Sequence, residues 1–202
     1  MPKQCPHFKL LEDRVLVLKS KFLDAELKKE EKDPLTFDAD NDQLAAFRLL
    51  FHGEVEDFLE SKAKENIKKL EQDLKHPRWV RSYPELLSLA MALKKQAPIS
   101  DDFDLQKFKS FVDVLIAGAN SSIKENNGIK SQSFLLLSIC AGKTIDEIDT
   151  VLSSSLNSYG KDRGDVAHKS VTHSRTLSAP STELANASTL VTQIGAYFDV
   201  TA

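Results

Sequence analysis

The most constraining feature of this sequence is a run of apolar residues at helical spacing across residues 44–74. Its apolar members recur every three or four positions: Leu44, Phe47, Phe51, Val55, Phe58, Ala63, Ile67, Leu70 and Leu74. This period is typical of one amphipathic helix that ends at Pro77. About 33 residues at ~1.5 Å each give a rod ~50 Å long, which exceeds the needs of a compact domain. We therefore expect the second half, Lys62 to Lys75, either to project or to bend back as a hairpin.

Shorter segments with the same period predict further helices on both sides of the long one. They lie over about residues 8–31, from Pro84 to Pro98, from Asp101 or Asp102 to Asn127-Gly128, through Phe134 to Cys140, from Thr144 onward, and near the C-terminal end. Strictly alternating apolar residues, which indicate strands, are not evident. The sequence predicts an all-α fold: a bundle of about four to five main helices with short extra helices. We expect one domain over residues 1–202, with an N-terminal helix in 1–32 and a C-terminal helix in 182–200.

Composition supports an ordinary globular protein. The 202 residues are 41% hydrophobic and 28% charged, enough to bury a substantial core. The two cysteines, Cys5 and Cys140, lack the spacing of a zinc site or a disulfide framework, and Cys140 is expected in the core. No apolar run approaches the ~20 residues that cross a membrane, and no signal-peptide core is present. We expect a cytoplasmic chain without membrane contact.

The strongest chemical signal lies between Tyr159 and Ser170, a segment that contains Arg163 and His168. A guanidinium is always charged and offers a planar fork of donors that matches a phosphate. An imidazole gives or takes a proton near neutral pH. The pair therefore suits phosphodiester chemistry, although an Arg-x4-His spacing also occurs as a surface ion pair beside an incidental histidine.

Arg163 continues an apolar stripe that contains Ile145, Ile148, Leu152, Leu156 and Tyr159. Because an unpaired guanidinium is costly to bury, Arg163 pairs with a carboxylate, lines a cleft, or lies where the chain has left the helix. The flanking Gly160 and Gly164 favour a helix break. In an unbroken helix, His168 would lie ~140° around the axis from Arg163. A kink or a second subunit would then be needed to bring both to one phosphate.

The charge around this segment is more positive than the rest of the chain. The whole sequence has a formal charge of −3, which is unlike a general nucleic-acid binder. Between Gly160 and Arg175 there are four cations and two anions, for a net charge of 4 − 2 = +2: Lys161, Arg163, Lys169 and Arg175 against Asp162 and Asp165. Such a local patch is what a phosphate-binding site needs.

The segments from Asn126 to Ile129 and from Arg163 to Ser170, with the helix between them, resemble the C-terminal half of a HEPN domain of the RiboL-PSP-HEPN branch. The stretch from Leu49 to Leu59 is similar to a long helix of that branch, and the likeness covers about residues 40–175. The resemblance implies a four- or five-helix bundle with metal-independent endoribonuclease activity and no cofactor. It also implies a toxin, phage-defence or RNA-processing setting and a homodimer whose two motifs face one cleft.

Carried over residue by residue, the resemblance makes Arg163 and His168 the catalytic pair. One His168 would take the proton of a ribose 2′-OH, while Arg163 stabilises the charge on the phosphate. Products would have 2′,3′-cyclic phosphate and 5′-OH ends. We expect Lys161, Lys169 and Arg175 to contact flanking phosphates, with Asp165 as a further supporting residue and Glu56 orienting the motif. Each of these supporting residues could instead be a solvated charge or part of a structural ion pair.

Two further interpretations remain open at the level of sequence. Many active HEPN members carry a polar residue directly after the arginine, whereas this chain carries Gly164. That difference favours a non-catalytic HEPN-like module that dimerises and binds RNA, a nucleotide or a protein partner, whereas an antitoxin or other regulatory partner would belong to the nuclease. The other interpretation is a helical interaction protein in which Arg163 forms an internal ion pair.

Overall fold

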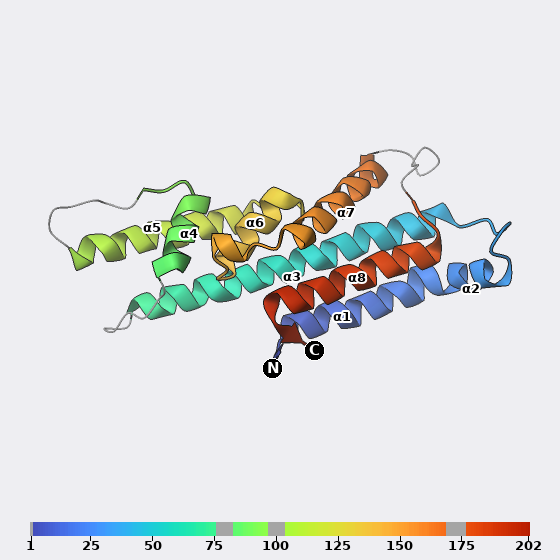
Figure 1. The fold of residues 1–202 in the computed structure, drawn as a ribbon, viewed down its shortest axis with the longest axis horizontal. Helices are drawn as coiled ribbons and strands as arrows, with labels where there is room; N and C mark the ends of the chain where they lie inside the picture. The colour runs from blue at the N-terminus through green and yellow to red at the C-terminus, as the bar shows by residue number, and fades with distance from the viewer. Residues whose placement is uncertain (1, 76–82, 97–103, 169–176) are drawn as a thin grey trace. The chain divides into compact units, whose positions relative to one another are not determined.

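The computed structural model describes residues 2–75, 83–96, 104–168 and 177–202, and of residues 83 and 165–168 only the backbone. These parts are mostly helical, so the all-α prediction is confirmed (Figure 1). In chain order the elements are β1 (Lys3–Gln4), α1 (Pro6–Leu18), the π-helical turn η1 (Lys19–Leu23), α2 (Asp24–Lys32), α3 (Asn41–Lys75), α4 (Tyr83–Ala92), α5 (Leu105–Lys124), α6 (Ser131–Cys140), the 3₁₀ turn η2 (Ile145–Glu147), α7 (Thr150–His168), α8 (Pro180–Phe198) and β2 (Val200–Thr201).

The chain forms two compact units. The first contains Met1–Phe58, Gly128–Ser131 and Asp149–Ala202, and the second contains Leu59–Asn127 and Gln132–Ile148. In sequence, the second unit therefore consists of two segments, which Gly128–Ser131 of the first unit separates. Helix α3 contributes its first half to one unit and its second half to the other.

Aromatic side chains fill the core of the first unit. The ring of Phe58 on α3 makes edge contacts with Phe8 on α1, at a centroid distance of 5.7 Å, and with Phe198 on α8, at 5.6 Å. Gly195 on α8 faces the ring of Phe8 so closely that an added Cβ would lie 2.8 Å from its Cζ. The two helices can approach each other at this point because residue 195 has no side chain.

Two short strands join the ends of the first unit. Strands β1 and β2 pair in parallel, with Lys3 opposite Val200 and Gln4 opposite Thr201. The sequence did not predict them, because two residues are too few to show an alternating pattern.

A buried ion pair links α3 to α8 in the same unit. Arg48 and Glu183 are 3% and 0% exposed, and Arg48 Nε donates to Glu183 Oε2 at 3.1 Å. The Arg48 Nη2 atom donates to the other carboxylate oxygen, so the contact is bidentate. The backbone N–H of Ser178 also donates to that carboxylate, at 2.9 Å. The carboxylate is thereby well satisfied despite its burial.

The second unit is held by hydrogen bonds at its helix ends. Asp104 caps α5 by accepting from the backbone N–H groups of Gln106 and Lys107. The side chain of Asn66 on α3 donates to the carbonyl of Cys140, at the end of α6, at 2.9 Å. Cys140 itself is fully buried, as predicted.

Several predicted boundaries are wrong. Helix α3 neither bends back nor projects after Lys62, because Ala63, Ile67 and Leu70 are buried within the second unit. Helix α5 is capped by Asp104, whereas Asp101 and Asp102 lie outside the described residues. In the first helical segment, the turn η1 places Leu18 and Leu23 in the core, five positions apart. A regular 3.6-residue period from Leu18 would place Phe22 in the core instead, but Phe22 is only half-buried.

Candidate functional site

Helix α7 carries the predicted catalytic pair, and it begins later than the sequence indicated. Thr144 and Glu147 form a capping interaction, in which the Glu147 carboxylate accepts from the Thr144 backbone N–H at 2.8 Å. That interaction closes only the short turn η2. The long helix starts at Thr150, where Asp149 accepts from the N–H groups of Val151 and Leu152 at 2.8 and 2.9 Å.

The predicted helix break between Tyr159 and His168 is absent. Helix α7 continues through both glycines to His168, because an interior glycine costs only ~1 kcal/mol. Gly160 has a packing role, since an added Cβ would lie 3.1 Å from Lys130 Cγ. By contrast, nothing lies within 4 Å of a Cβ at Gly164. The backbone positions of Arg163 and His168 therefore lie ~140° apart around the axis of one helix.

Arg163 extends the buried face of α7 that begins with Leu152, Leu156 and Tyr159. Its side chain is half-buried, and its Nε atom is buried with no hydrogen-bond partner among the described residues. No ion pair of Arg163 is found in the part of the chain that the structure describes. A buried guanidinium N–H without an acceptor costs free energy, and an anionic ligand would satisfy it.

His52 lies within the electrostatic reach of Arg163. It projects from α3, is 2% exposed, and its Nδ1 atom has no hydrogen-bond partner in the described parts of the chain. Burial first, and then the charges of Arg163 and Lys130, lower the pKa of His52 to about 4. The imidazole is thus neutral at pH 7, and its 3.8 Å separation from a Glu56 oxygen is not an ion pair under those conditions.

Glu56 is one helical turn after His52 and anchors the segment between α5 and α6. Its carboxylate accepts a hydrogen bond from the backbone N–H of Gly128. Gly128 has a φ of +117°, which disfavours any other residue, and the His52 ring lies 3.9 Å from where its Cβ would be. This contact fixes the loop that carries Lys130 over Gly160.

These residues make one group in the first unit, which we call the Arg163 cluster: His52, Glu56, Gly128, Lys130 and Arg163. Its ionisable groups are two cations, one carboxylate and one neutral imidazole. The cluster therefore has a local positive charge on a chain that is negative overall. It suits a phosphate, with the imidazole as a hydrogen-bonding neighbour.

The structure describes some predicted site residues with their side chains, others by their backbone alone, and two not at all. Arg163 and Glu56 both lie beside His52, whereas Lys161 is exposed to solvent. The backbones of Asp165 and His168 belong to α7, but their side chains lie outside the description, as do Lys169 and Arg175 entirely. The prediction that His168 acts with Arg163 stays a prediction.

Sequence reasoning did not predict Lys130, and it treated His52 mainly as a packed helix residue. A usable signal was present, because Arg48, His52 and Glu56 are polar residues at a spacing of four beside the apolar stripe of α3. Such a line of ionisable residues next to a core face indicates partners on other elements. Lys130 gave no comparable signal, since it lies in a loop.

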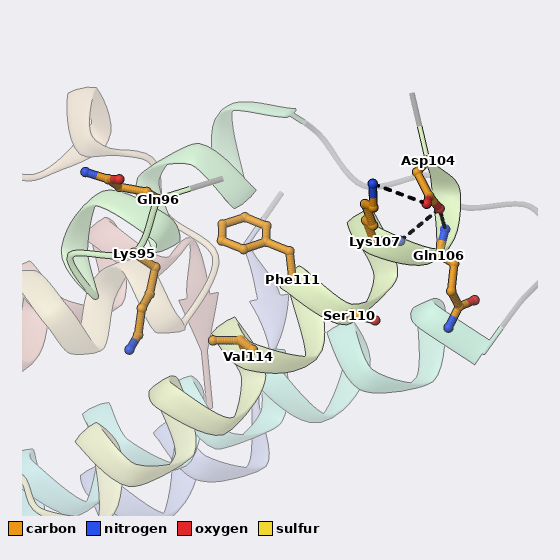
Figure 2. Close-up of a pocket in the computed structure, with 8 residues that line it drawn as sticks. All are labelled: Lys95, Gln96, Asp104, Gln106, Lys107, Ser110, Phe111 and Val114. Carbon is orange, nitrogen blue, oxygen red and sulfur yellow. Dashed lines mark hydrogen bonds and ion pairs between the residues drawn. The ribbon is translucent and has the colours of Figure 1, made fainter. Parts of the chain in front are cut away.

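Apart from the Arg163 cluster, a hollow of about 520 Å³ lies in the second unit (Figure 2). It is lined by Lys95 and Gln96 after α4 and by Phe111 and Val114 on α5. The carboxylate at its rim belongs to Asp104, which already caps α5. Among the described residues, no lining side chain of this hollow has a buried polar atom without a partner, so the Arg163 cluster is the better candidate.

The described residues also limit other kinds of site. They contain no group of three or more His, Cys, Asp or Glu side chains arranged to hold a metal ion. None of the described helices combines the length and apolar character needed to cross a membrane.

Comparisons of the chain with models of protein families, with curated proteins and with solved structures find no significant match.

Proposed function

We propose that this protein is a metal-independent endoribonuclease of the HEPN type. The observation that carries the proposal is the half-buried Arg163, whose Nε has no partner among the described residues and which lies beside the neutral His52 and the cation of Lys130. An RNA phosphate would satisfy the guanidinium and be attracted by both cations.

The proposed reaction needs no group besides the protein and the RNA. His168 removes the proton of a ribose 2′-OH, whose oxygen attacks the adjacent phosphorus. Arg163 stabilises the added negative charge in the transition state. The bond to the 5′ oxygen then breaks, and a second His168 or a water molecule protonates the departing oxygen. The products have 2′,3′-cyclic phosphate and 5′-OH ends.

The unbroken helix α7 supports a site shared by two copies of the chain. Within one chain, the helix positions of Arg163 and His168 are ~140° apart, a separation that does not favour contact of both residues with one phosphate. In a homodimer, the arginine of one copy and the histidine of the other can face the same RNA. A toxin or phage-defence role, restrained by an antitoxin, fits such an activity.

The first test is cleavage of a mixed set of single-stranded and structured RNAs in the presence of a chelator, with mapping of product ends. We expect Arg163→Ala and His168→Ala each to lower the rate by at least a hundredfold. Arg14→Ala and His7→Ala are matched controls on α1, outside the cluster, and should cleave like wild type. Cleavage by well-folded Arg163→Ala at the wild-type rate would refute the assignment.

Mixing the two inactive variants tests the shared site. If the cleft takes residues from both copies, Arg163→Ala and His168→Ala chains should together regain part of the activity that each lacks alone. Catalysis within a single chain predicts no recovery, because neither chain carries both residues.

A non-catalytic RNA-binding module is the second candidate. The observation that favours it is the open space around Gly164, where many HEPN nucleases carry a polar side chain. On this alternative the wild-type protein binds RNA, Arg163→Ala weakens that binding, and no RNA is cut. Toxicity on expression that disappears with His168→Ala would favour the nuclease.

A further inference from the structure

A groove with a volume of about 340 Å³ lies in the first unit, between α7 and α8. Figure 1 shows these two helices in orange and red. The groove differs from the Arg163 cluster in its chemistry, because its lining is dominated by hydroxyl and amide groups. Its described lining residues include Ser158, Tyr159 and Asp162 from α7 and Asn186, Thr189 and Gln193 from α8.

Two buried polar atoms among these lining residues have no hydrogen-bond partner in the described parts of the protein. They are the hydroxyl of Tyr159, a residue only 7% exposed, and Oε1 of Gln193. Buried polar atoms are almost always satisfied, and leaving one unpaired costs ~1–3 kcal/mol. Two such atoms from two different helices at one groove indicate a ligand that supplies hydrogen bonds.

The charge of the groove disfavours a phosphate as that ligand. Asp162 is the charged member of its described lining, and its carboxylate would repel an anion. A carboxylate accepts hydrogen bonds, so the ligand must present N–H or O–H donors. Gln193 Oε1 needs a donor as well, whereas the hydroxyl of Tyr159 can give or accept.

We propose that this groove binds a nucleobase of the RNA, with guanine preferred, a specificity that rests on the proposed function. Asp162 directly precedes Arg163 on α7, so a base in the groove would belong to a nucleotide adjoining the phosphate at Arg163. Guanine presents two neighbouring donors, N1–H and the N2 amino group, which together match one carboxylate. Uracil and adenine do not present that pair, and unpaired bases of single-stranded RNA are read on this edge.

The amide of Asn186 and the hydroxyl of Ser158 provide further donors for the O6 and N7 acceptors of the same base. Arg163 then sets the position of the backbone, and the groove sets the identity of the base. Contacts to phosphate generally position a nucleic acid without reading its sequence, and contacts to base edges supply the specificity.

The experiment measures binding without cleavage. Four trinucleotides that carry 2′-O-methyl groups, and differ only in a central G, A, C or U, are titrated against the protein. We expect wild type to bind the G trinucleotide at least tenfold more tightly than the others. Asp162→Asn and Gln193→Ala should each remove most of that preference. Thr192→Ala is the matched control, because its hydroxyl is bonded to the Ser188 carbonyl within α8.

Arg163→Ala separates this proposal from the proposed nuclease. It should weaken binding of all four trinucleotides by a similar factor and leave the preference for G intact. Equal binding of the four by wild type, or a preference that survives in both groove variants, overturns the guanine site even if RNA is cut. A G preference that depends on Asp162, without any cleavage of unmodified RNA, supports the groove and overturns the nuclease.

Discussion

Arg48 on α3 and Glu183 on α8 form a bidentate ion pair in which both side chains are at most 3% exposed. The Glu183 carboxylate accepts a third hydrogen bond, from the backbone N–H of Ser178. The pair joins two helices that come from distant parts of the sequence, and Tyr159, which lines the groove between α7 and α8, lies near it. The charge of Glu183 raises the pKa of that phenol, after the larger effect of burial.

Breaking this pair should be among the most damaging single changes in the first unit. Replacing Glu183 with Leu, or Arg48 with Met, leaves the other charge buried and unmatched, which typically costs ~3–5 kcal/mol of unfolding free energy. Urea denaturation measures the loss. The double variant Arg48→Met/Glu183→Leu should be more stable than the sum of the single losses implies. Strictly additive losses would show that the two side chains do not act as a pair.

His52 should make stability depend on pH in a defined window. Its pKa is about 4 when folded and 6.5 as the unperturbed value, so between these limits the unfolded state binds more protons. Stability is then full above pH 6.5 and falls toward pH 4, by as much as ~3 kcal/mol from this group. Unfolding free energies at pH 7 and pH 4.5 measure the effect.

The pH dependence has a matched control. His52→Gln should show a smaller loss between the two pH values than wild type, because one titrating group has been removed. Glu56, Lys130 and Arg163, which face the imidazole, remain unchanged in that variant. His7→Gln controls for loss of a histidine elsewhere. Identical pH slopes in wild type and His52→Gln would contradict the role assigned to burial.

Gly195 and Gly53 should respond oppositely to alanine. A Cβ at residue 195 meets the Phe8 ring at 2.8 Å, and that ring is fixed against Phe58, so Gly195→Ala should destabilise by ~1–3 kcal/mol. At residue 53, within α3, nothing lies within 4 Å of the added atom. Gly53→Ala should therefore stabilise by ~0.5–1 kcal/mol through helix propensity. Thermal or urea unfolding distinguishes the two signs.

The proposed chemistry requires the ribose 2′-OH and no metal ion. RNA cleavage should proceed at the same rate with excess chelator, and a 2′-deoxy substitution at the cut site should abolish it. The same oligonucleotide with a single deoxynucleotide elsewhere is the control for binding. Loss of activity in chelator would reject the mechanism, since nothing in it could then explain the dependence.

The sequence predicted the helices well where their apolar period is long. The nine apolar positions of α3 are all buried, because a stripe that extends over many turns leaves one way to cover it. The same logic predicted that Leu152, Leu156 and Tyr159 face inward on α7. It failed at η1, where one widened turn shifts the buried position from Phe22 to Leu23. A local change in helix type leaves no mark on a regular pattern.

The candidate site was harder to predict than the fold. Arg163 stood out because a charged residue interrupts an apolar face, which is visible in one segment alone. The proximity of His52 and Lys130 depends on three separate segments that meet only in the folded chain. Gly160 was taken as a helix breaker, yet its small size serves the approach of Lys130. Local propensity does not contain this kind of tertiary information.

The pairing of β1 with β2 has a consequence for synthesis on the ribosome. Lys3 can pair with Val200 only after Val200 has left the exit tunnel. The strand pairing of the first unit therefore cannot form while the preceding residues are still being synthesised. The second unit has all its residues by Ile148 and can fold sooner. The Arg163 cluster belongs to the first unit, whose strand pairing forms late. The unit that carries Arg163 therefore completes its strand pairing only when nearly all of the 202 residues have been synthesised.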